Sequence, residues 1–338
     1  MESTSFFFHP IAPPTGSSVK IRTFTADKNT GVSEIIGGVR FGIEEMACER
    51  SLLAELFQRA GLPDYSEPCS RKMIMQRRGN SSIMAIINVT PDSFYAGSRK
   101  NDRDEILKII KSDPEYIDIG GESTRPGSVE VSPEEEIRRL SGNVEFIKEN
   151  YRGKLSLDTR HAETAEKFIE YADMINDVSG LGNTALAAIS EEHGREYVLM
   201  HTVGTPQTME NHTHYSNLFG EMAMFYFGKL KILSEMGMKP ERILIDPGLG
   251  FAKDSNSNIE IMKNPWMLNF GFRRVFGHSR KRFLGSVSGS PADKRLPETL
   301  AGSISLYING VEIIRVHDPE ENISAIKTFS LFGGFSAF

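Results

Sequence analysis

The sequence is poor in cysteine. Cys48 and Cys69 are the only two cysteines among 338 residues, and they do not have the spacing of metal ligands. So few cysteines exclude a disulfide framework and are typical of proteins from a reducing compartment. The N-terminus has neither a basic segment nor the long apolar segment of a signal peptide. We therefore expect a cytoplasmic protein.

Long apolar runs and an excess of positive charge are also missing. No stretch of about 18 apolar residues occurs, so the sequence predicts no membrane-spanning helix. The formal net charge is −6, which gives no electrostatic reason to expect nucleic acid as a partner. With 39% hydrophobic and 25% charged residues, the composition fits a globular protein with a sizeable core. The expected partners are small molecules.

A repeated pattern begins at residue 82, where short apolar runs rich in β-branched residues alternate with helical patterns. Eight such runs occur, at residues 83–88, 116–120, 155–158, 174–177, 197–201, 243–246, 274–277 and 312–316. Apolar strands that alternate with helices indicate a parallel sheet covered on both faces. Eight repeats favour a (β/α)8 TIM barrel over residues 82–338, although an open doubly wound sheet also fits the pattern.

Residues 1–81 do not share this pattern. We assign them to an N-terminal extension of unknown role, either a small appended subdomain or a cap over the barrel floor. Within the extension, residues 43–60 have a helical pattern that ends at Gly61. Residues 132–150 are also predicted to be helical, because Pro133 and the acidic residues after it are helix-start signals.

Polar residues stand at nearly every predicted strand end. They are Asn88, residues 120–122, Asp158, Asn176, Asp177, His201, Asp246, residues 279–281, Arg315 and His317. In a closed barrel the C-terminal ends of the strands face one mouth, where active sites lie. A single Asp after a strand is more often a helix cap or turn former, and a single His is more often structural. Because polar residues recur at the ends of eight predicted strands, the pattern favours a binding or catalytic site.

The predicted mouth has two chemical halves. One half offers acceptors and an amide, which suit the edge of a flat amino-heterocycle: Asp158, Asn176 and Asp246. The other offers donors and positive charge, which suit a phosphate or a carboxylate: Asn88, Lys281, Arg315 and His317. The residues alone therefore predict a substrate that carries both an amino-heterocycle and a phosphate-type group.

Two segments have a distinctive sequence: residues 88–94 read Asn-Val-Thr-Pro-Asp-Ser-Phe, and residues 120–127 read Gly-Gly-Glu-Ser-Thr-Arg-Pro-Gly. They resemble the loop signatures of the dihydropteroate synthases, a family of pterin-binding enzymes. Shorter matches follow at residues 157–159, 175–180, 199–201, 246–251, 279–281 and 315–318. The resemblance covers roughly residues 82–330, in family order and at every predicted strand end.

This resemblance implies a reaction and its requirements. Such enzymes are (β/α)8 barrels, typically homodimers, that act in folate biosynthesis. They are transferases that condense 7,8-dihydropterin-6-ylmethyl diphosphate with p-aminobenzoate and release diphosphate, usually with Mg²⁺. No nucleophile on the protein is required, and the sequence has no Gly-x-Ser-x-Gly motif. The predicted helices at residues 132–150 and 299–309 could each supply a dimer face.

The resemblance also implies roles for individual residues. The expected substrate-binding residues are Asp158, Asn176 and Asp246 at the pterin edge, Lys281 and Phe251 beside the pterin, and Arg315 and His317 at the diphosphate. Asn88 is expected to help hold Mg²⁺. Thr124, Arg125 and Pro126 are expected on a loop that closes over the arylamine. Asn88, Thr124, Arg125 and Lys281 are thus the expected catalytic residues.

Two departures from the family pattern concern the second substrate. Ala96 stands where an acidic residue is usual, and Arg282 stands where a small serine is usual. They leave two alternatives open. The second substrate could be a phosphoribosyl arylamine of a methanopterin-type pathway, which Arg282 would favour, or the protein could be a non-catalytic pterin-binding paralogue. A pterin-dependent methyltransferase is disfavoured, because such enzymes need no diphosphate grip like Arg315 and His317.

Overall fold

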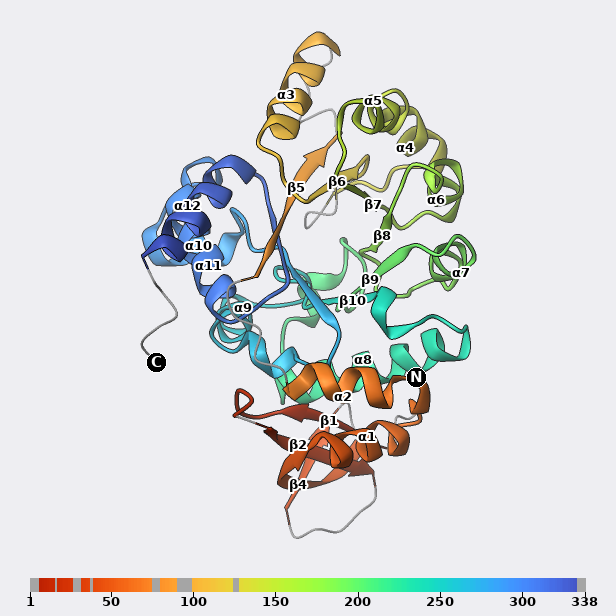
Figure 1. Ribbon diagram of the computed structural model, residues 1–338, viewed down its shortest axis with the longest axis vertical. Coiled ribbons are helices and arrows are strands. Elements are labelled where there is room, and N and C mark those ends of the chain that lie inside the picture. The colour runs from red at the N-terminus through yellow and green to blue at the C-terminus, as the bar shows by residue number, and fades with distance from the viewer. Residues whose placement is uncertain are drawn as a thin grey trace.

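A computed structural model describes residues 6–15, 17–26, 32–36, 39–74, 80–89, 99–123 and 128–332. Eight parallel strands, β5 to β12, form a closed barrel, and an antiparallel sheet of β1 to β4 stands beside it. In Figure 1 this sheet, in red and orange, lies at one end of the molecule next to α8. The predicted (β/α)8 TIM barrel is confirmed.

The barrel strands follow the predicted apolar runs. They are β5 (Ser82–Asn88), β6 (Tyr116–Gly120), β7 (Lys154–Asp158), β8 (Met174–Asp177), β9 (Glu196–Met200), β10 (Ile243–Asp246), β11 (Arg273–Phe276) and β12 (Ile313–Val316). Each strand pairs with the next, and β12 closes the barrel on β5 through the pair Ile313 and Ser82. All eight predicted runs are present, and no predicted end is more than one residue from the observed end.

Helices cover the outside of the barrel. They are α3 (Arg99–Lys111), α4 (Pro133–Leu140), α5 (Asn143–Asn150), α6 (Ala162–Phe168), α7 (Ala185–Glu192), α8 (Leu218–Glu235), α9 (Ser255–Lys263), α10 (Arg282–Ser288), α11 (Leu296–Ile308) and α12 (Pro319–Leu331). Short 3-10 turns are η1 (Pro63–Tyr65), η2 (Met209–His212), η3 (Pro240–Arg242), η4 (Pro265–Leu268) and η5 (Ala292–Lys294). Among the described residues, no helix is long and apolar enough to cross a membrane.

The predicted helix over residues 132–150 is two helices. It begins as expected at Pro133, where the Ser132 side chain caps α4 by accepting a hydrogen bond from the Glu135 N–H at 3.3 Å. Gly142 has a φ of +79°, a left-handed conformation that breaks the run between α4 and α5. The chain therefore turns where the sequence pattern continues.

Inside the barrel, apolar side chains form a plug at the N-terminal end of the strands. The plug residues are Met84, Tyr116, Met174, Val198, Leu244, Val275 and Ile313, and β7 contributes the buried Ser156 at the same level. Successive side chains of a strand point to opposite faces, so the residue two positions further also faces the interior, nearer the mouth. The plug thus determines which residues can line the site.

Residues 6–74, which we call the N-terminal subdomain, form the antiparallel sheet and two helices. Its elements are β1 (Phe6–Pro10), β2 (Ser18–Ala26), β3 (Ser33–Ile36), β4 (Val39–Glu49), α1 (Arg50–Arg59) and α2 (Ser66–Ile74), with strand order β1-β2-β4-β3. The predicted helix over residues 43–60 is wrong in its first part, because residues 43–49 belong to β4 and pair with β2. It ends as predicted, at Gly61 with a φ of +77°.

The N-terminal subdomain packs against α8 on the flank of the barrel. The Phe8 ring lies 4.8 Å from the Phe227 ring of α8 and 5.1 Å from the Phe57 ring of α1. The Tyr65 hydroxyl donates to the Met238 carbonyl at 2.8 Å. Both parts of the chain share one contiguous apolar core. The subdomain also contacts the segment that leads into β11, where the Tyr65 ring lies 5.6 Å from the Phe272 ring and Asn269 Nδ2 donates to the Met73 carbonyl at 3.2 Å.

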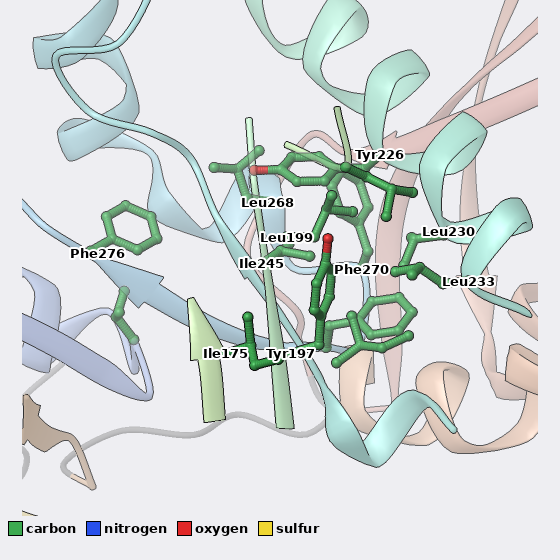
Figure 2. Packing of buried hydrophobic residues seen from close by; sticks show 14 of the residues in the cluster. Ile175, Tyr197, Leu199, Tyr226, Leu230, Leu233, Ile245, Leu268, Phe270 and Phe276 are labelled. Atoms are coloured by element: carbon green, nitrogen blue, oxygen red, sulfur yellow. The ribbon is translucent and has the colours of Figure 1, made fainter. Parts of the chain in front are cut away.

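On its other side, α8 packs against the barrel strands. Figure 2 shows Tyr226, Leu230 and Leu233 of α8 directed toward the strands. The side chains that they approach include Leu199 of β9 and Ile245 of β10. Helix α8 is thus buried between the barrel and the N-terminal subdomain.

Candidate active site

A polar layer lies directly above the apolar plug, on the mouth side. It consists of inward-facing side chains two positions beyond the plug level: Asp118, Asp158, Asn176, Asp246 and Arg315. All except Arg315 are buried, and Asp118 is completely so. The site residues that the sequence placed at strand ends therefore meet inside one barrel.

Arg315 joins two carboxylates of this layer. Its Nε donates to Asp118 Oδ2 and its Nη2 to Asp158 Oδ2, both at 2.6 Å. Asn176 Nδ2 donates to the same Asp118 oxygen at 3.1 Å. The sequence predicted an acidic half facing a cationic half, whereas the structure interlocks the two halves through this guanidinium.

Asp118 was not predicted from the sequence. It lies in the middle of the apolar run of β6 and not at a strand end. A charged residue inside a fully buried strand was the available signal, because burying a carboxylate is costly unless a partner compensates. Arg315 is that partner.

Burial shapes the protonation of the layer. Loss of water raises the pKa of Asp158, with Asp118 adding to the effect and Arg315 opposing it. Burial also raises the pKa of Asp246, against the hydrogen bond that its Oδ1 accepts from the Gly248 N–H at 2.7 Å. Within the described part of the chain, the buried Oδ1 atoms of Asp118 and Asn176 have no hydrogen-bond partner. The layer thus offers acceptor capacity to a ligand with N–H donors.

Lys281 and Phe251 form one wall of the site. Lys281 Nζ donates to the Leu249 carbonyl and lies 4.7 Å from the centroid of the Phe251 ring. Gly250 has a φ of +80°, and a Cβ there would lie 3.0 Å from Lys281 Cδ, so this position requires glycine. Loss of solvent lowers the pKa of Lys281 to about 8, with Asp246 opposing. We call this pair the Lys281–Phe251 wall.

A second lysine, Lys253, is buried behind this wall. Its Nζ donates to the carbonyls of Phe251 at 3.0 Å and Gly248 at 3.3 Å, and lies 2.9 Å from His201 Nδ1. Burial lowers the pKa of Lys253 to about 7 and that of His201 well below its usual value. Lys253 therefore holds the loop between Asp246 and Phe251. No sequence pattern pointed to Lys253, since a lysine after a predicted loop is ordinarily exposed.

Next to this wall, beyond β12, lies His317, whose Nδ1 is 3.1 Å from the Ser279 hydroxyl. Arg280, next to Ser279, forms an ion pair with Asp318, with Nε 2.9 Å from Oδ2. Asn88 ends β5 in register with Gly120. His317 and Asn88, two of the residues predicted for the cationic half, thus lie at the mouth ends of β12 and β5.

Two polar residues of the predicted mouth point elsewhere. The Asp177 carboxylate accepts hydrogen bonds from the Leu181 N–H at 3.0 Å and the Tyr197 hydroxyl at 2.5 Å, so it fixes a loop outside the barrel interior. The Arg282 side chain is 84% exposed and lies 4.0 Å from Glu210. Thr124, Arg125 and Pro126, and also Ala96, lie outside the described residues.

Three comparisons place this geometry among known proteins. A family model described as "Pterin binding enzyme" matches residues 84–317. The chain is 37% identical over 246 residues to a dihydropteroate synthase of Synechocystis sp., which covers 70% of this chain and 85% of the relative. It is 34% identical over 289 residues to a bifunctional dihydropteroate synthase/dihydropteroate reductase of Helicobacter pylori, covering 83% of this chain and 76% of the relative.

The fold is similar to that of solved proteins as well. A dihydropteroate synthase of Clostridium difficile, solved in the presence of pteroic acid, superposes with a TM-score of 0.69 at 32% identity. The superposition covers 76% of this chain and 98% of the other. The part of this chain without a counterpart there is about as long as the extension before the barrel.

Proposed function

Because this chain belongs to the pterin-binding enzyme family and its relatives are dihydropteroate synthases, we propose that its polar layer is the pterin site of such a synthase. The enzyme is a transferase that joins 7,8-dihydropterin-6-ylmethyl diphosphate to p-aminobenzoate. The bond between the methylene carbon and the diphosphate oxygen breaks, and a carbon–nitrogen bond forms. The amine gives up one proton, and 7,8-dihydropteroate and diphosphate leave. This reaction is a step of folate biosynthesis.

The observation that carries the pterin assignment is the buried polar layer with its unpartnered acceptors. A pterin edge presents N–H donors and ring-nitrogen acceptors, which match the carboxylates of Asp158 and Asp246 and the amide of Asn176. Hydrogen bonds of this kind are stronger where water is excluded. The Lys281–Phe251 wall would lie along the ring.

The departing diphosphate needs positive charge where its negative charge grows. We assign this role to Arg315 and His317, beside Lys281. Arg315 shares its charge with Asp118 and Asp158, so it also balances the carboxylates that hold the pterin. Thr124, Arg125 and Pro126 are proposed to contact the arylamine, and no nucleophile on the protein takes part.

The residues of the mouth fit a bound Mg²⁺ ion if the substrate supplies most of the ligands of the metal. In the described ranges, no three His, Cys, Asp or Glu side chains gather as a metal site. Mg²⁺ commonly keeps several waters and binds through one or two protein oxygens plus substrate phosphates. The amide oxygen of Asn88 would be the protein ligand. When bound, the ion would neutralise charge on the diphosphate.

The test is diphosphate release from dihydropterin-methyl diphosphate with Mg²⁺, measured with and without p-aminobenzoate. Release that depends on p-aminobenzoate, together with a pteroate product, supports the proposal. Pterin binding without such release would favour a phosphoribosyl arylamine or a binding-only paralogue. The exposed position of Arg282 at the mouth makes phosphorylated arylamines the next compounds to assay in that case.

A second candidate function is reduction of the product. The alignment with the bifunctional Helicobacter pylori relative covers 83% of this chain, more than residues 82–338 alone supply, so it extends into the residues before the barrel. We infer that the residues before the barrel contribute to a reduction of dihydropteroate, the second activity in the name of that relative. Oxidation of NADPH that requires dihydropteroate would support this inference. Oxidation at the rate seen without protein would reject it.

We also propose a cytoplasmic homodimer. Both cysteines are buried and free, as suits a reducing compartment. For the dimer, α4 is the weaker candidate face because its Glu135 is paired with Arg138 and Arg139. The C-terminal ends of α11 and α12 instead expose large apolar side chains, among them Leu331. Light scattering of the full chain measures the subunit number directly, and a monomeric mass would reject the dimer.

A further inference from the structure

The loop between β9 and α8, residues 201–217, connects the N-terminal subdomain with the active-site mouth. On the subdomain side, Asn217 Nδ2 donates to Glu34 Oε2 at 2.8 Å, and the Ser216 hydroxyl donates to the Ile35 carbonyl at 3.3 Å. Glu34 and Ile35 belong to β3, an edge strand of the sheet. The edge strand of the extension therefore reaches the rim of the barrel.

Asn217 is held at both ends of its amide group. Its Oδ1 caps α8 by accepting from the Gly220 N–H at 2.8 Å, while its Nδ2 binds Glu34. The Glu221 carboxylate fixes the preceding turn by accepting from the N–H groups of Ser216 at 2.8 Å and Asn217 at 3.1 Å. Glu34 is thus the one group from the subdomain in this described network that fixes the orientation of the capping amide.

On the mouth side, the loop supports the Lys281–Phe251 wall. The Tyr215 hydroxyl donates to the Ala252 carbonyl at 2.7 Å. Ala252 follows Phe251 directly and has a φ of +47°, a strained conformation for a residue with a Cβ. The Tyr215 ring also lies 6.1 Å from the ring of His201. Only Ser216 lies between Tyr215 and Asn217, so the two contacts are mechanically connected.

The loop reaches two further parts of the mouth. Gln207 Nε2 donates to the Ser128 carbonyl, beyond β6, at 3.3 Å, and Glu210 lies 4.0 Å from Arg282 at the start of α10. One loop therefore touches the segments that follow β6, β10 and β11, and its far end rests on the N-terminal subdomain.

From this geometry we propose that Glu34 is a positioning residue for the active site, acting through Asn217 and Tyr215 on the Lys281–Phe251 wall. The N-terminal subdomain thereby shapes pterin binding from outside the barrel. The proposal rests on the assignment of this wall to the pterin site. If loss of the Glu34 contact displaces Tyr215, the Ala252 carbonyl loses its hydrogen bond. Phe251 is then held less firmly against Lys281.

The test compares full-length variants by calorimetric titration with dihydropterin-methyl diphosphate and by steady-state kinetics. Glu34→Ala is expected to raise the dissociation constant and KM for this ligand about three- to tenfold, the size of one lost hydrogen bond, with kcat within about twofold. Glu34→Gln keeps an oxygen acceptor and is expected to restore binding to within about twofold. Glu45→Ala, which removes only the exposed pair with Arg22 on the same sheet, is the matched control.

A double-mutant cycle tests the route through the loop. Tyr215→Phe removes only the hydroxyl and is expected to raise the same constant, and Glu34→Ala combined with Tyr215→Phe should cost little more than either alone. Fully additive effects would overturn the proposed route. A lower melting temperature with unchanged ligand affinity in Glu34→Ala would overturn the proposal, because Glu34 would then serve only the helix cap. Absence of binding by the wild type would instead reject the pterin site itself.

Discussion

Asp158 shares the guanidinium of Arg315 with Asp118 in a part of the barrel from which water is excluded. Such a carboxylate has two consequences for a ligand. Paired with Arg315 in its ionised form, it accepts hydrogen bonds only, and it sets the charge balance next to the anion-binding residues. An amide has the same shape but lacks the charge and one acceptor oxygen. Replacing Asp158 by Asn therefore tests how charge and acceptor capacity affect ligand binding while the packing stays the same.

We predict that Asp158→Asn weakens binding of dihydropterin-methyl diphosphate by about ten- to a hundredfold, the range for a lost hydrogen bond to a charged group. Calorimetric titration measures this directly. The same chemical change at the exposed Asp104 of α3 should leave affinity unchanged. Equal affinities for the wild type and Asp158→Asn would show that the pterin edge binds elsewhere.

The pKa of Lys281, lowered to about 8 by loss of solvent, predicts an alkaline limit to activity. The ammonium charge is lost as pH rises through about 8, so kcat/KM should fall above that pH. Lys281→Arg should extend activity to higher pH, since a guanidinium stays charged. Lys281→Ala should lower turnover at least about tenfold, as expected for one lost electrostatic contact in an active site, at every pH and with the fold intact.

Unfolding does not account for this expected loss. A lysine with a lowered pKa holds fewer protons in the folded chain than in the unfolded chain between about pH 8 and its usual value. Its contribution to the free energy of unfolding therefore rises with pH over this interval. Melting curves at pH 7 and 9 separate the two effects, and a parallel fall of activity and stability would contradict the assignment to Lys281.

At the level of elements, helix α8 lies between two apolar surfaces. Phe227, which is 1% exposed, packs against Phe8 of the N-terminal subdomain and has its ring 5.7 Å from that of Phe270. We predict that Phe227→Ala lowers the free energy of unfolding by about 3–5 kcal/mol, the usual cost of a large aromatic cavity. Urea unfolding measures it. Lys231→Ala, at an exposed position one turn further along α8, should change stability by less than about 0.5 kcal/mol.

The elements also reveal what sequence patterns can predict. The eight barrel strands were predictable because each is a short apolar run buried on both faces. Each strand pairs with strands of the same kind, so its local sequence already reflects its surroundings in the fold. β4 was not predictable, since residues 43–49 include Glu44, Glu45 and Glu49, whose spacing is compatible with a helix. Its pairing with β2 from Phe41 to Glu49 overrides the local preference.

The candidate site was predictable to a similar extent. Residues at strand ends were found from their position, and the structure brings Asp158, Asn176, Asp246 and Arg315 together. Asp118 and Lys253 were missed because their importance comes from contacts made by the folded chain, with Arg315 and His201 respectively. The link from Glu34 to Asn217 joins residues 183 positions apart, and no local pattern encodes it.

For the whole molecule, the shared core predicts that the barrel depends on the N-terminal subdomain. A chain of residues 82–338 would expose Phe227 and Phe219 of α8, which the subdomain helps to bury in the full-length protein. We predict lower soluble yield and a lower melting temperature for this shortened chain than for the full chain. Thermal unfolding of both, followed by light scattering, measures the difference. A shortened barrel as stable and soluble as the full chain would contradict the prediction.

The packing of Phe8 on Phe227 has a further consequence while the chain is being made. The ribosome releases the four-stranded sheet first, and its partner helix emerges only after about 170–190 more residues. At about 5–20 residues per second, the aromatic face of the nascent sheet stays uncovered for about 10–40 seconds. During translation this apolar face lacks its partner, and in the finished protein α8 covers it.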